Sequence, residues 1–549
     1  MRIIYLIMLS VLVVDLAVAA DLLAGWFAGF ALAAAVGTGW LAYRWFFQAQ
    51  ATLARGWVLG QAIEITNPDR PTSVPRAIID EKIIRLGMLV LGAPGAGKTE
   101  SAELGYLYAL PTYLPNTGWA YFEGKGDTDI YRKAVAMGAK PDHFFSTELP
   151  GSETINLFAG DAHDVIDRLG HSLIGSTTST SFYSDEQRTV LLKIVPLLKS
   201  LPVPTNLRDL YAVLAVEDAG AALLHDARTA GAPTTDIQLA RQWLEEPFKD
   251  RVKSIRGLLN RLYIFCNGPN ALRLNAYQPD LDLQKIVADG KKLYLHLPLT
   301  QFARDVAIAI IETLHVEARQ RQLAGTENAA LYPLLFDDWG AFFHSNFGPF
   351  SARCRSAAMP LSFGFQSRAQ LETVSRAFAD ELDDTIATKV ILRIQGDSTA
   401  AYAQRLLGLY DKTRISTSQR DDSQGEGSNV SAQATARIDA RALRELSPGE
   451  AYISTLEPTR HGVANPLWKL RFPLPPFDGW RQVPMPTARI HEEGEGLGYW
   501  TRFVDEQQIA ELLAVLDDRE AVAERDLTTR RTVADAALAG NPGFGVDDL

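Results

Sequence analysis

Two long apolar runs open the chain, ahead of any amphipathic pattern. Residues 3–20 are apolar except for Asp15, and residues 22–43 carry no charged side chain before Arg44. A helix needs about 20 apolar residues to cross the hydrocarbon core of a bilayer, and each run supplies that length. The pattern predicts a hairpin of two transmembrane helices, at about 3–20 and 22–47.

Aromatic residues and arginines follow the second run, which predicts that the remainder of the chain lies on the cytoplasmic side. The alternative for residues 1–20 is a cleaved signal peptide, because Ala17-Val18-Ala19 resembles a cleavage site. Both interpretations leave residues 45 onward on the inner side, provided that the second run spans the membrane.

An apolar strand pattern runs directly into a glycine-rich turn at residues 86–99, LGMLVLGAPGAGKT. Strand, glycine-rich turn and helix in this order form a P-loop, in which successive backbone N–H groups surround phosphates at a helix N-terminus. We expect Lys98 to reach the β- and γ-phosphates of ATP and Thr99 to place its hydroxyl on Mg²⁺. The predicted nucleotide-binding residues are Gly92, Ala93, Pro94, Gly95, Ala96, Gly97, Lys98, Thr99 and Glu100.

A second apolar run ends in two carboxylates at residues 331–338, LYPLLFDD. A P-loop needs such a partner at the end of another buried strand, because a carboxylate must help to hold the Mg²⁺. We expect Asp337 to be this Walker B residue and to share the metal site with Thr99. Asp338 is expected to position or deprotonate the attacking water.

The middle and the end of the chain show other patterns. Residues 161–285 carry repeated helical patterns without a convincing strand order, which predicts an all-α domain. Residues 415–437 are rich in Ser and Gln and lack an apolar period, which predicts a mobile surface loop. Residues 476–549 are predicted to form a helical and acidic C-terminal tail.

Charge and cysteine content narrow the classes of function. The 549-residue chain has a formal net charge of -11, so it is not a basic coat that binds duplex DNA through bulk charge. Any DNA contact must be local, for instance in the pore of a ring. Two distant cysteines support neither a disulfide framework nor a zinc site. A cluster of basic residues is either a DNA contact or a solvated helix face: Lys249, Arg251, Lys253, Arg256 and Arg261.

The order of these motifs resembles the TraD/TraG family of type IV secretion coupling proteins over nearly the whole chain. Residues 118–138 are similar to the family's strand that ends in an acidic, lysine-glycine turn, and residues 363–371 match its strand and glutamine motif. Residues 387–408 and 441–454 resemble its last core strands.

The resemblance implies an α/β fold: a RecA-like P-loop ATPase domain with an inserted all-α domain and an N-terminal transmembrane hairpin. The expected boundaries are 1–50 for the membrane anchor, 51–160 and 286–475 for the nucleotide-binding domain, 161–285 for the all-α domain and 476–549 for the tail.

The resemblance also implies site residues and partners. Gln366 would sense the γ-phosphate or orient water, and an arginine from a neighbouring subunit would complete the site, with Arg355 the first candidate and Arg353 the second. The expected assembly is a homo-hexamer in the bacterial inner membrane that moves single-stranded DNA without sequence preference. Its partners would be a relaxase or relaxosome and the channel proteins.

Two alternatives remain open at the level of sequence. One is an FtsK/HerA-type DNA translocase, although the residues after 504 are too few for a terminal DNA-reading domain. The other is a nucleotide-gated membrane scaffold that binds ATP without hydrolysing it productively, because relatives of this kind usually carry Glu at the position of Asp338.

Overall fold

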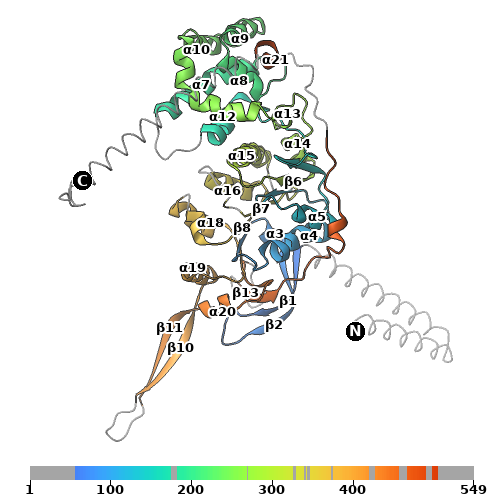
Figure 1. Ribbon diagram of the computed structural model, residues 1–549. Coiled ribbons are helices and arrows are strands. Elements are labelled where there is room, and N and C mark those ends of the chain that lie inside the picture. Colours follow the sequence, from blue (N-terminus) through green and yellow to red (C-terminus); the bar gives the residue numbers. More distant parts are fainter. Residues whose placement is uncertain are drawn as a thin grey trace, which may run out of the picture. The chain divides into compact units, whose positions relative to one another are not determined.

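The computed structural model (Figure 1) describes most of the chain after its first 55 residues. The described residues are 56–174, 182–268, 270–325, 329–338, 340, 342, 347–372, 375–418, 427–456, 466–489 and 498–504. The chain divides into two compact units. Unit 1 takes residues 1–152, 283–307 and 314–488, and unit 2 takes residues 153–282, 308–313 and 489–549.

Unit 1 is a mixed α/β structure. Its strands are β1 (Gly56–Glu64), β2 (Thr72–Asp80), β3 (Met88–Leu91), β4 (Trp119–Glu123), β5 (His143–Ser146), β6 (Lys292–His296), β7 (Leu334–Asp337), β8 (Leu361–Phe365), β9 (Thr388–Ile391), β10 (Leu409–Ser418), β11 (Gly427–Ala436), β12 (Glu450–Ser454) and β13 (Leu467–Arg471). Its helices are α3 (Glu81–Ile84), a π-helical turn (Lys98–Glu103), α4 (Leu104–Tyr113), α5 (Thr128–Ala136), α14 (Leu283–Ala288), α16 (Phe347–Ser356), α17 (Arg368–Glu372), α18 (Arg376–Thr385), α19 (Asp397–Leu407), α20 (Ala440–Arg444) and a 3₁₀ turn (Trp480–Gln482). Helix α15 (Gln301–Ala324) contributes residues to both units.

One large sheet organises unit 1. Within the described residues it has 11 strands in the order β2-β1-β13-β12-β9-β3-β8-β7-β4-β6-β5. The segment from β9 to β5 is parallel throughout, whereas β12, β13, β1 and β2 extend it as antiparallel strands. The carboxyl ends of the parallel strands therefore meet at one edge, where α/β sheets bind ligands. The predicted α/β class is confirmed.

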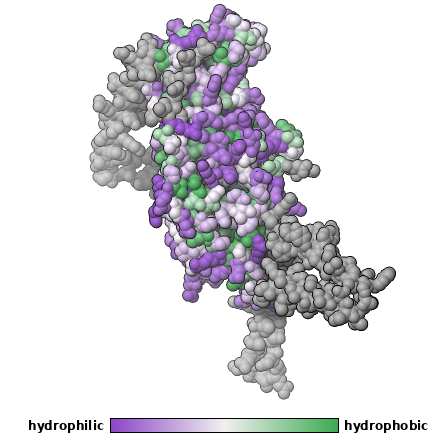
Figure 2. Space-filling view, turned by 90° about the vertical axis from the view of Figure 1, so that its right-hand side faces the viewer, coloured by the Kyte–Doolittle hydropathy of each residue, from purple (hydrophilic) through white to green (hydrophobic). Residues whose placement is uncertain are grey.

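Both faces of the parallel strands are covered, which explains their nearly continuous apolar sequences. On one face, Leu107 of α4 and Ala134 of α5 belong to a buried cluster with Tyr121 and Tyr294 of the sheet. On the other, Phe347 of α16 packs against the strands, and its ring lies 5.7 Å from Phe336 and 5.5 Å from Phe363. In the view of Figure 2, hydrophilic residues cover much of the surface and hydrophobic ones form small patches.

The segment predicted as a mobile loop, 415–437, is mostly a hairpin. Strands β10 and β11 pair in antiparallel register from Leu409–Ala436 to Ser418–Gly427, and Figure 1 draws them as an arm that extends from the sheet domain. The loop prediction is wrong for these strands, and residues 419–426 lie outside the described residues. The prediction failed because a two-stranded ribbon has no buried face of its own, so its sequence needs no apolar alternation.

The segments expected to be the last core strands contain helices as well. Residues 387–408 hold the short strand β9 and then α19, and residues 441–454 hold the end of α20 and then β12. Each strand is preceded or followed by a helix that returns the chain to the sheet.

Unit 2 is helical. Its helices are α6 (Ala162–Leu169), a π-helical turn (Gly170–Ile174), α7 (Phe182–Lys199), α8 (Leu207–Ala215), α9 (Glu217–Thr229), α10 (Thr234–Leu244), α11 (Phe248–Ser254), α12 (Arg256–Cys266), α13 (Ala271–Leu274) and α21 (Tyr499–Phe503). Part of the predicted basic cluster serves this packing. Arg251 is buried, with its guanidinium 5.0 Å from the ring of Trp243, and Arg261 donates to the carbonyl of Leu173.

A buried carboxylate fixes α21 to the helices of unit 2. Asp209 forms a capping box with Asn206 at the start of α8, and it accepts hydrogen bonds from the Tyr277 hydroxyl at 3.1 Å and from the Trp500 N–H at 3.3 Å. Only glycine fits at 498, because a Cβ there would overlap both Tyr277 and Asp209. Residues 498–504 are thereby attached through specific polar contacts.

The prediction of a multi-pass membrane protein needs correction. Within the described ranges, no helix has both the length and the apolar character that a bilayer crossing demands. Even the 24-residue α15 carries charged side chains in its middle, among them Asp305, Glu312 and Glu317. The multi-pass location is thus wrong for the described part of the chain, and the two predicted spans, about 3–20 and 22–47, lie outside it.

Candidate nucleotide-binding site

The glycine-rich turn after β3 is a tightly fixed loop at the carboxyl edge of the sheet. The Ala93 N–H donates to the Arg393 carbonyl at 2.8 Å, which ties the start of the loop to the segment after β9. Gly97 has a φ of 93°, and a Cβ there would lie 3.0 Å from the backbone nitrogen of Gly449. The Gly449 N–H donates to the Ala96 carbonyl at 3.0 Å. A side chain at 97 would therefore disturb the hydrogen bond between Gly449 and the loop. The positive φ at this position also favours glycine.

Lys98 begins the wide helical turn that follows the loop. Its ammonium is largely buried and donates to the Gly92 carbonyl at 3.0 Å, so the side chain folds back over the loop. Burial lowers the pKa of Lys98, and the nearby Glu103 carboxyl partly offsets that effect. This is the expected position for a lysine that contacts phosphates bound by the loop.

Thr99 and Asp337 meet at the point where a shared metal ion would be held. The Thr99 hydroxyl lies 3.2 and 3.3 Å from the two carboxylate oxygens of Asp337. Asp337 ends β7 and is fully buried. β8 separates β7 from the P-loop strand β3, so the two motifs reach one site from strands that are not adjacent.

Lys125 completes this cluster, and we had not assigned it a role from the sequence. Its ammonium lies 2.8 and 3.0 Å from the Asp337 oxygens and 3.2 Å from the Thr99 hydroxyl. Burial has the largest single effect and lowers the pKa of Lys125, but the charge and hydrogen bond of Asp337, together with the charges of Glu103 and Asp338, outweigh it, so the net pKa is raised. The available signal was its place two residues beyond the end of β4, because β4 pairs with β7 so that Glu123 lies opposite Asp337.

Glu103 is a second residue that sequence reasoning missed. It is buried under the P-loop helix, where the Tyr121 hydroxyl donates to it at 3.3 Å. Burial raises its pKa well above the usual range, and the Asp337 charge adds to the effect. Its carboxyl group lies against Gly364 of β8 so closely that a Cβ at 364 would overlap it. No motif pattern includes this position.

Two further predicted catalytic residues, Asp338 and Gln366, lie at the carboxyl ends of the neighbouring strands β7 and β8. Asp338 has a φ of 53°, and its Oδ1 is buried without a hydrogen-bond partner among the described residues. An unsatisfied oxygen on a strained backbone is typical of a functional position. Gln366 follows β8, and its backbone N–H donates to the Gln370 side chain at 2.7 Å, which fixes the turn.

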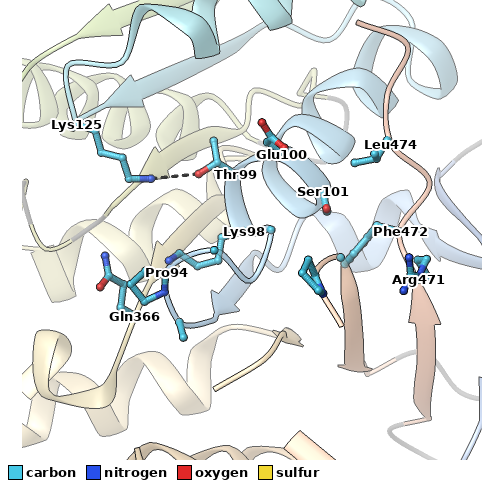
Figure 3. Close-up of a pocket in the computed structure, with 15 residues that line it drawn as sticks. Pro94, Lys98, Thr99, Glu100, Ser101, Lys125, Gln366, Arg471, Phe472 and Leu474 are labelled. Atoms are coloured by element: carbon cyan, nitrogen blue, oxygen red, sulfur yellow. Dashed lines mark hydrogen bonds between the residues drawn. The ribbon is translucent and has the colours of Figure 1, made fainter. Parts of the chain in front are cut away.

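The glycine-rich loop, Thr99, Lys125 and Gln366 line a cavity of about 510 Å³, whereas Asp337 and Asp338 are not among its lining residues, and Figure 3 shows the lining. Lys98, Thr99, Lys125 and Gln366 lie toward one end of the view, and Phe472 lies toward the other. The full lining comprises Ala93, Pro94, Gly95, Gly97, Lys98, Thr99, Glu100, Ser101, Lys125, Gln366, Pro448, Gly449, Arg471, Phe472 and Leu474. Of the predicted loop residues, Gly92 and Ala96 do not line the cavity. Their carbonyls accept hydrogen bonds from Lys98 and from the Gly449 N–H. Arg471, Phe472 and Leu474 also line the cavity. They belong to no recognised motif, so the sequence did not predict them.

Arg355, the predicted neighbour-completing arginine, lies elsewhere in its own chain. It lines a small pocket with Gly87, Leu361 and Ile386, which lie just before β3, at the first residue of β8 and two residues before β9. Those strands are parallel and the P-loop follows the carboxyl end of β3, so Arg355 is at the opposite edge of the sheet. Its side chain is exposed. Arg353, the second candidate, contacts the His315 ring at 2.8 Å.

The residues of the site fit Mg²⁺ and a nucleoside triphosphate. The volume of about 510 Å³ lies in the range of small-molecule pockets. The hydroxyl of Thr99 and the carboxylate of Asp337 are oxygen ligands of the kind that Mg²⁺ prefers. The glycine-rich loop provides a backbone cradle that a Cβ at Gly97 would displace.

Comparison with known proteins agrees with this geometry. A family model described as the TraM recognition site of TraD and TraG matches residues 342–448. The predicted resemblance to the TraD/TraG family is confirmed, and the match lies in these residues. The matched segment is no appended domain, because it includes β8 and β9, the two strands that flank the P-loop strand. A comparison with curated proteins found no match.

The TraD/TraG-like chain is also similar in fold to solved structures of TrwB. A structure described as the bacterial conjugative coupling protein TrwB in complex with sulphate has a TM-score of 0.52 and 16% identity, and covers 76% of this chain and 91% of that one. The unbound form has a TM-score of 0.51 and 15% identity, with coverage of 72% and 86%. A structure of TrwB with ADP and Mg²⁺ has a TM-score of 0.50 and 15% identity, with coverage of 75% and 89%.

Proposed function

We propose that the chain is the ATP-hydrolysing coupling protein of a conjugative type IV secretion system, which passes single-stranded DNA and its bound relaxase to the channel. The observation that carries this proposal is the contact of Asp337 with Thr99, which lines one cavity together with Lys98, in a chain whose fold is similar to TrwB and whose residues 342–448 match the TraD/TraG segment. The sheet, with a P-loop after a central parallel strand, supports a RecA-like motor domain.

ATP and Mg²⁺ are the proposed ligands of the cavity. The loop from Gly92 to Gly97 would surround the phosphates with backbone N–H groups, and Lys98 would leave the Gly92 carbonyl to contact them. Thr99 and Asp337 would hold the metal. Bound Mg²⁺ would neutralise charge on the β- and γ-phosphates.

Hydrolysis would use the residues at the carboxyl ends of β7 and β8. Asp338 has a buried, unsatisfied carboxylate oxygen, which suits it to accept a proton from water or to orient it. Gln366 lines the same cavity and would hold that water or report the terminal phosphate. Arg355 is exposed at the opposite edge of the sheet, which favours action on a neighbouring copy in the proposed homo-hexamer.

The partner proposals follow from the family match. Residues 342–448 carry the segment described as the TraM recognition site, which supports a relaxosome-type protein as a partner. The segment includes the β10–β11 hairpin, which we propose as part of that contact surface. DNA is proposed to pass through the ring, where its negatively charged backbone would meet local positive charge rather than the acidic whole.

The test measures ATP hydrolysis by the purified full chain with and without single-stranded DNA, in the wild type and in Lys98→Ala. We expect DNA to stimulate the wild type and the variant to lose hydrolysis at both conditions. Equal rates in the two proteins would remove the motor proposal. Binding of labelled ATP without DNA stimulation would instead favour a nucleotide-gated scaffold.

A further inference from the structure

The strongest feature that the motif assignments leave unexplained is the ammonium group of Lys125. It contacts both oxygens of Asp337 and the hydroxyl of Thr99, at 2.8 to 3.2 Å. Those are the oxygens that would serve the metal in the proposed function. Figure 3 shows the Lys125 side chain reaching across to Thr99 from the loop after β4.

The backbone at Lys125 is fixed by hydrogen bonds to a buried carboxylate. The buried Glu123 accepts the N–H of Lys125 at 2.7 Å and the N–H of Gly126 at 3.0 Å. Gly126 has a φ of 80°, and a Cβ there would lie 3.1 Å from Pro298, so the turn is sterically confined as well. The side chain of Lys125 can therefore move while its Cα stays beside Asp337.

The contacts of Lys125 and a bound metal exclude one another. Mg²⁺ requires near-octahedral oxygen ligands at about 2.1 Å and keeps several of its waters. An ammonium group in hydrogen-bond contact with Thr99 and both oxygens of Asp337 occupies the space of that shell. Entry of the metal must therefore displace the ammonium from at least one of these residues.

The displaced ammonium would remain near an anion. Lys125 lines the same cavity as Lys98, Thr99 and Gln366, and its side chain is only one-third exposed, so the interior of the cavity lies within its reach. Two lysines in one cavity repel each other unless an anion lies between them. The chemical group that meets this description is the terminal phosphate of the bound nucleotide.

We infer that Lys125 is a triphosphate-specific positioning residue, whose ammonium moves from Asp337 and Thr99 to the terminal phosphate when the metal-nucleotide enters. This inference rests on the proposed ATPase site and assigns it a second phosphate-binding lysine from a different strand. A nucleoside diphosphate displaces the same ammonium but offers it no terminal phosphate. Lys125 therefore discriminates between the two nucleotides.

The test compares Lys125→Met and Lys125→Arg with the wild-type full chain. In Lys125→Met the metal competes with no ammonium, so the Kd for ADP in the presence of Mg²⁺ is expected to fall roughly fivefold. The preference for a non-hydrolysable ATP analogue over ADP is expected to shrink, and kcat to fall at least about tenfold. In Lys125→Arg the forked guanidinium holds Asp337 more firmly, so the Mg²⁺ concentration for half-maximal activity should rise.

The control is Lys140→Met, which removes the same charge from an exposed position after α5 and should leave all four quantities unchanged. The inference is supported if the Mg²⁺ concentration for half-maximal activity shifts in opposite directions, down in Lys125→Met and up in Lys125→Arg. A thermal melt shows whether each variant folds. The inference is overturned if either folded variant keeps the wild-type Mg²⁺ dependence and the wild-type ratio of ATP-analogue to ADP affinity. Lys98→Ala tests hydrolysis separately. If the Lys125 variants behave like the wild type but Lys98→Ala is inactive, the inference about Lys125 fails and the proposed function remains supported.

Discussion

The hydroxyl of Thr99 lies 3.2 Å from a carboxylate oxygen of Asp337, although 238 residues separate the two along the chain. The P-loop and the end of β7 thus supply one site, and neither residue is placed there by its local sequence. The first prediction follows from this distance. Asp337→Asn keeps the shape and removes the charge that we propose to hold the metal, so ATP hydrolysis should fall by at least about 100-fold.

Binding of a labelled nucleotide measured in EDTA is the control for Asp337→Asn. It should stay within about threefold of the wild type, because the loop and Lys98 contact phosphate without the metal. A variant that hydrolyses ATP at the wild-type rate would exclude Asp337 as the metal-holding carboxylate.

A second prediction concerns the close contact between β8 and the π-helical turn Lys98–Glu103 that follows the P-loop. Gly364→Ala would place a Cβ onto the Glu103 carboxyl, so this buried side chain or the backbone around it must shift. We expect the free energy of unfolding to fall by about 1–3 kcal/mol, as for other overpacked core sites. Gly105→Ala is the matched control, because its Cβ would meet only Trp57, at 3.8 Å, and should be neutral or slightly stabilising in a helix. Denaturant melts of both variants compare the two sites.

A third prediction uses the raised pKa of Glu123. Burial raises that pKa to about 7, although three backbone N–H groups favour the charged form. An unfolded glutamate titrates near 4.3. Between these pH values the folded chain binds more protons than the unfolded chain, so this contribution to stability is full below about pH 4.3 and is lost as the pH rises through 7.

Glu123→Gln removes that dependence. Urea unfolding of the wild type and of Glu123→Gln from pH 5 to pH 8 should show the wild type losing up to about 3 kcal/mol relative to the variant. A constant difference between the two proteins over this range would contradict the assignment. The comparison is made at each pH, because the amide also loses one hydrogen bond to the loop at every pH.

A fourth prediction concerns unit 2. Gly498→Ala would place a Cβ onto Tyr277 and Asp209, so residues 498–504 should detach from α8. Limited proteolysis should then cleave the chain near Trp500 faster than in the wild type, by about tenfold if about 1.4 kcal/mol of attachment is lost. Gly138→Ala is a comparison site whose Cβ would meet nothing within 4 Å, although its positive φ carries some strain. Unchanged cleavage at Trp500 in Gly498→Ala would show that the attachment tolerates a side chain.

Motifs that act through the backbone could be predicted from the sequence. The loop at Gly92–Thr99 has a required order of strand, glycines and helix, and Asp337 ends a recognisable buried strand, so both were found and the structure brings them together. Lys125 and Glu103 were not assigned, because their importance depends on which strands are neighbours. The order β3-β8-β7-β4 is a property of the whole fold.

Other errors have equally physical causes. The sequence of the β10–β11 ribbon is polar and has no apolar period, which predicts a loop, although the two strands pair along their whole length. For Arg251 the sequence leaves open a DNA contact or a solvated helix face, and the structure shows it buried on Trp243, because composition alone cannot distinguish an exposed cation from a stacked one.

Both ends of the β10–β11 ribbon are connected to the surroundings of the glycine-rich loop. One end of the ribbon is joined through α19 to β9, which lies beside the P-loop strand, and the other leads through α20 to Gly449, whose N–H supports Ala96. A protein that pulls or twists this arm would strain the loop from two sides at once. Binding of a partner to the ribbon would then change the conformation of the nucleotide-binding loop directly.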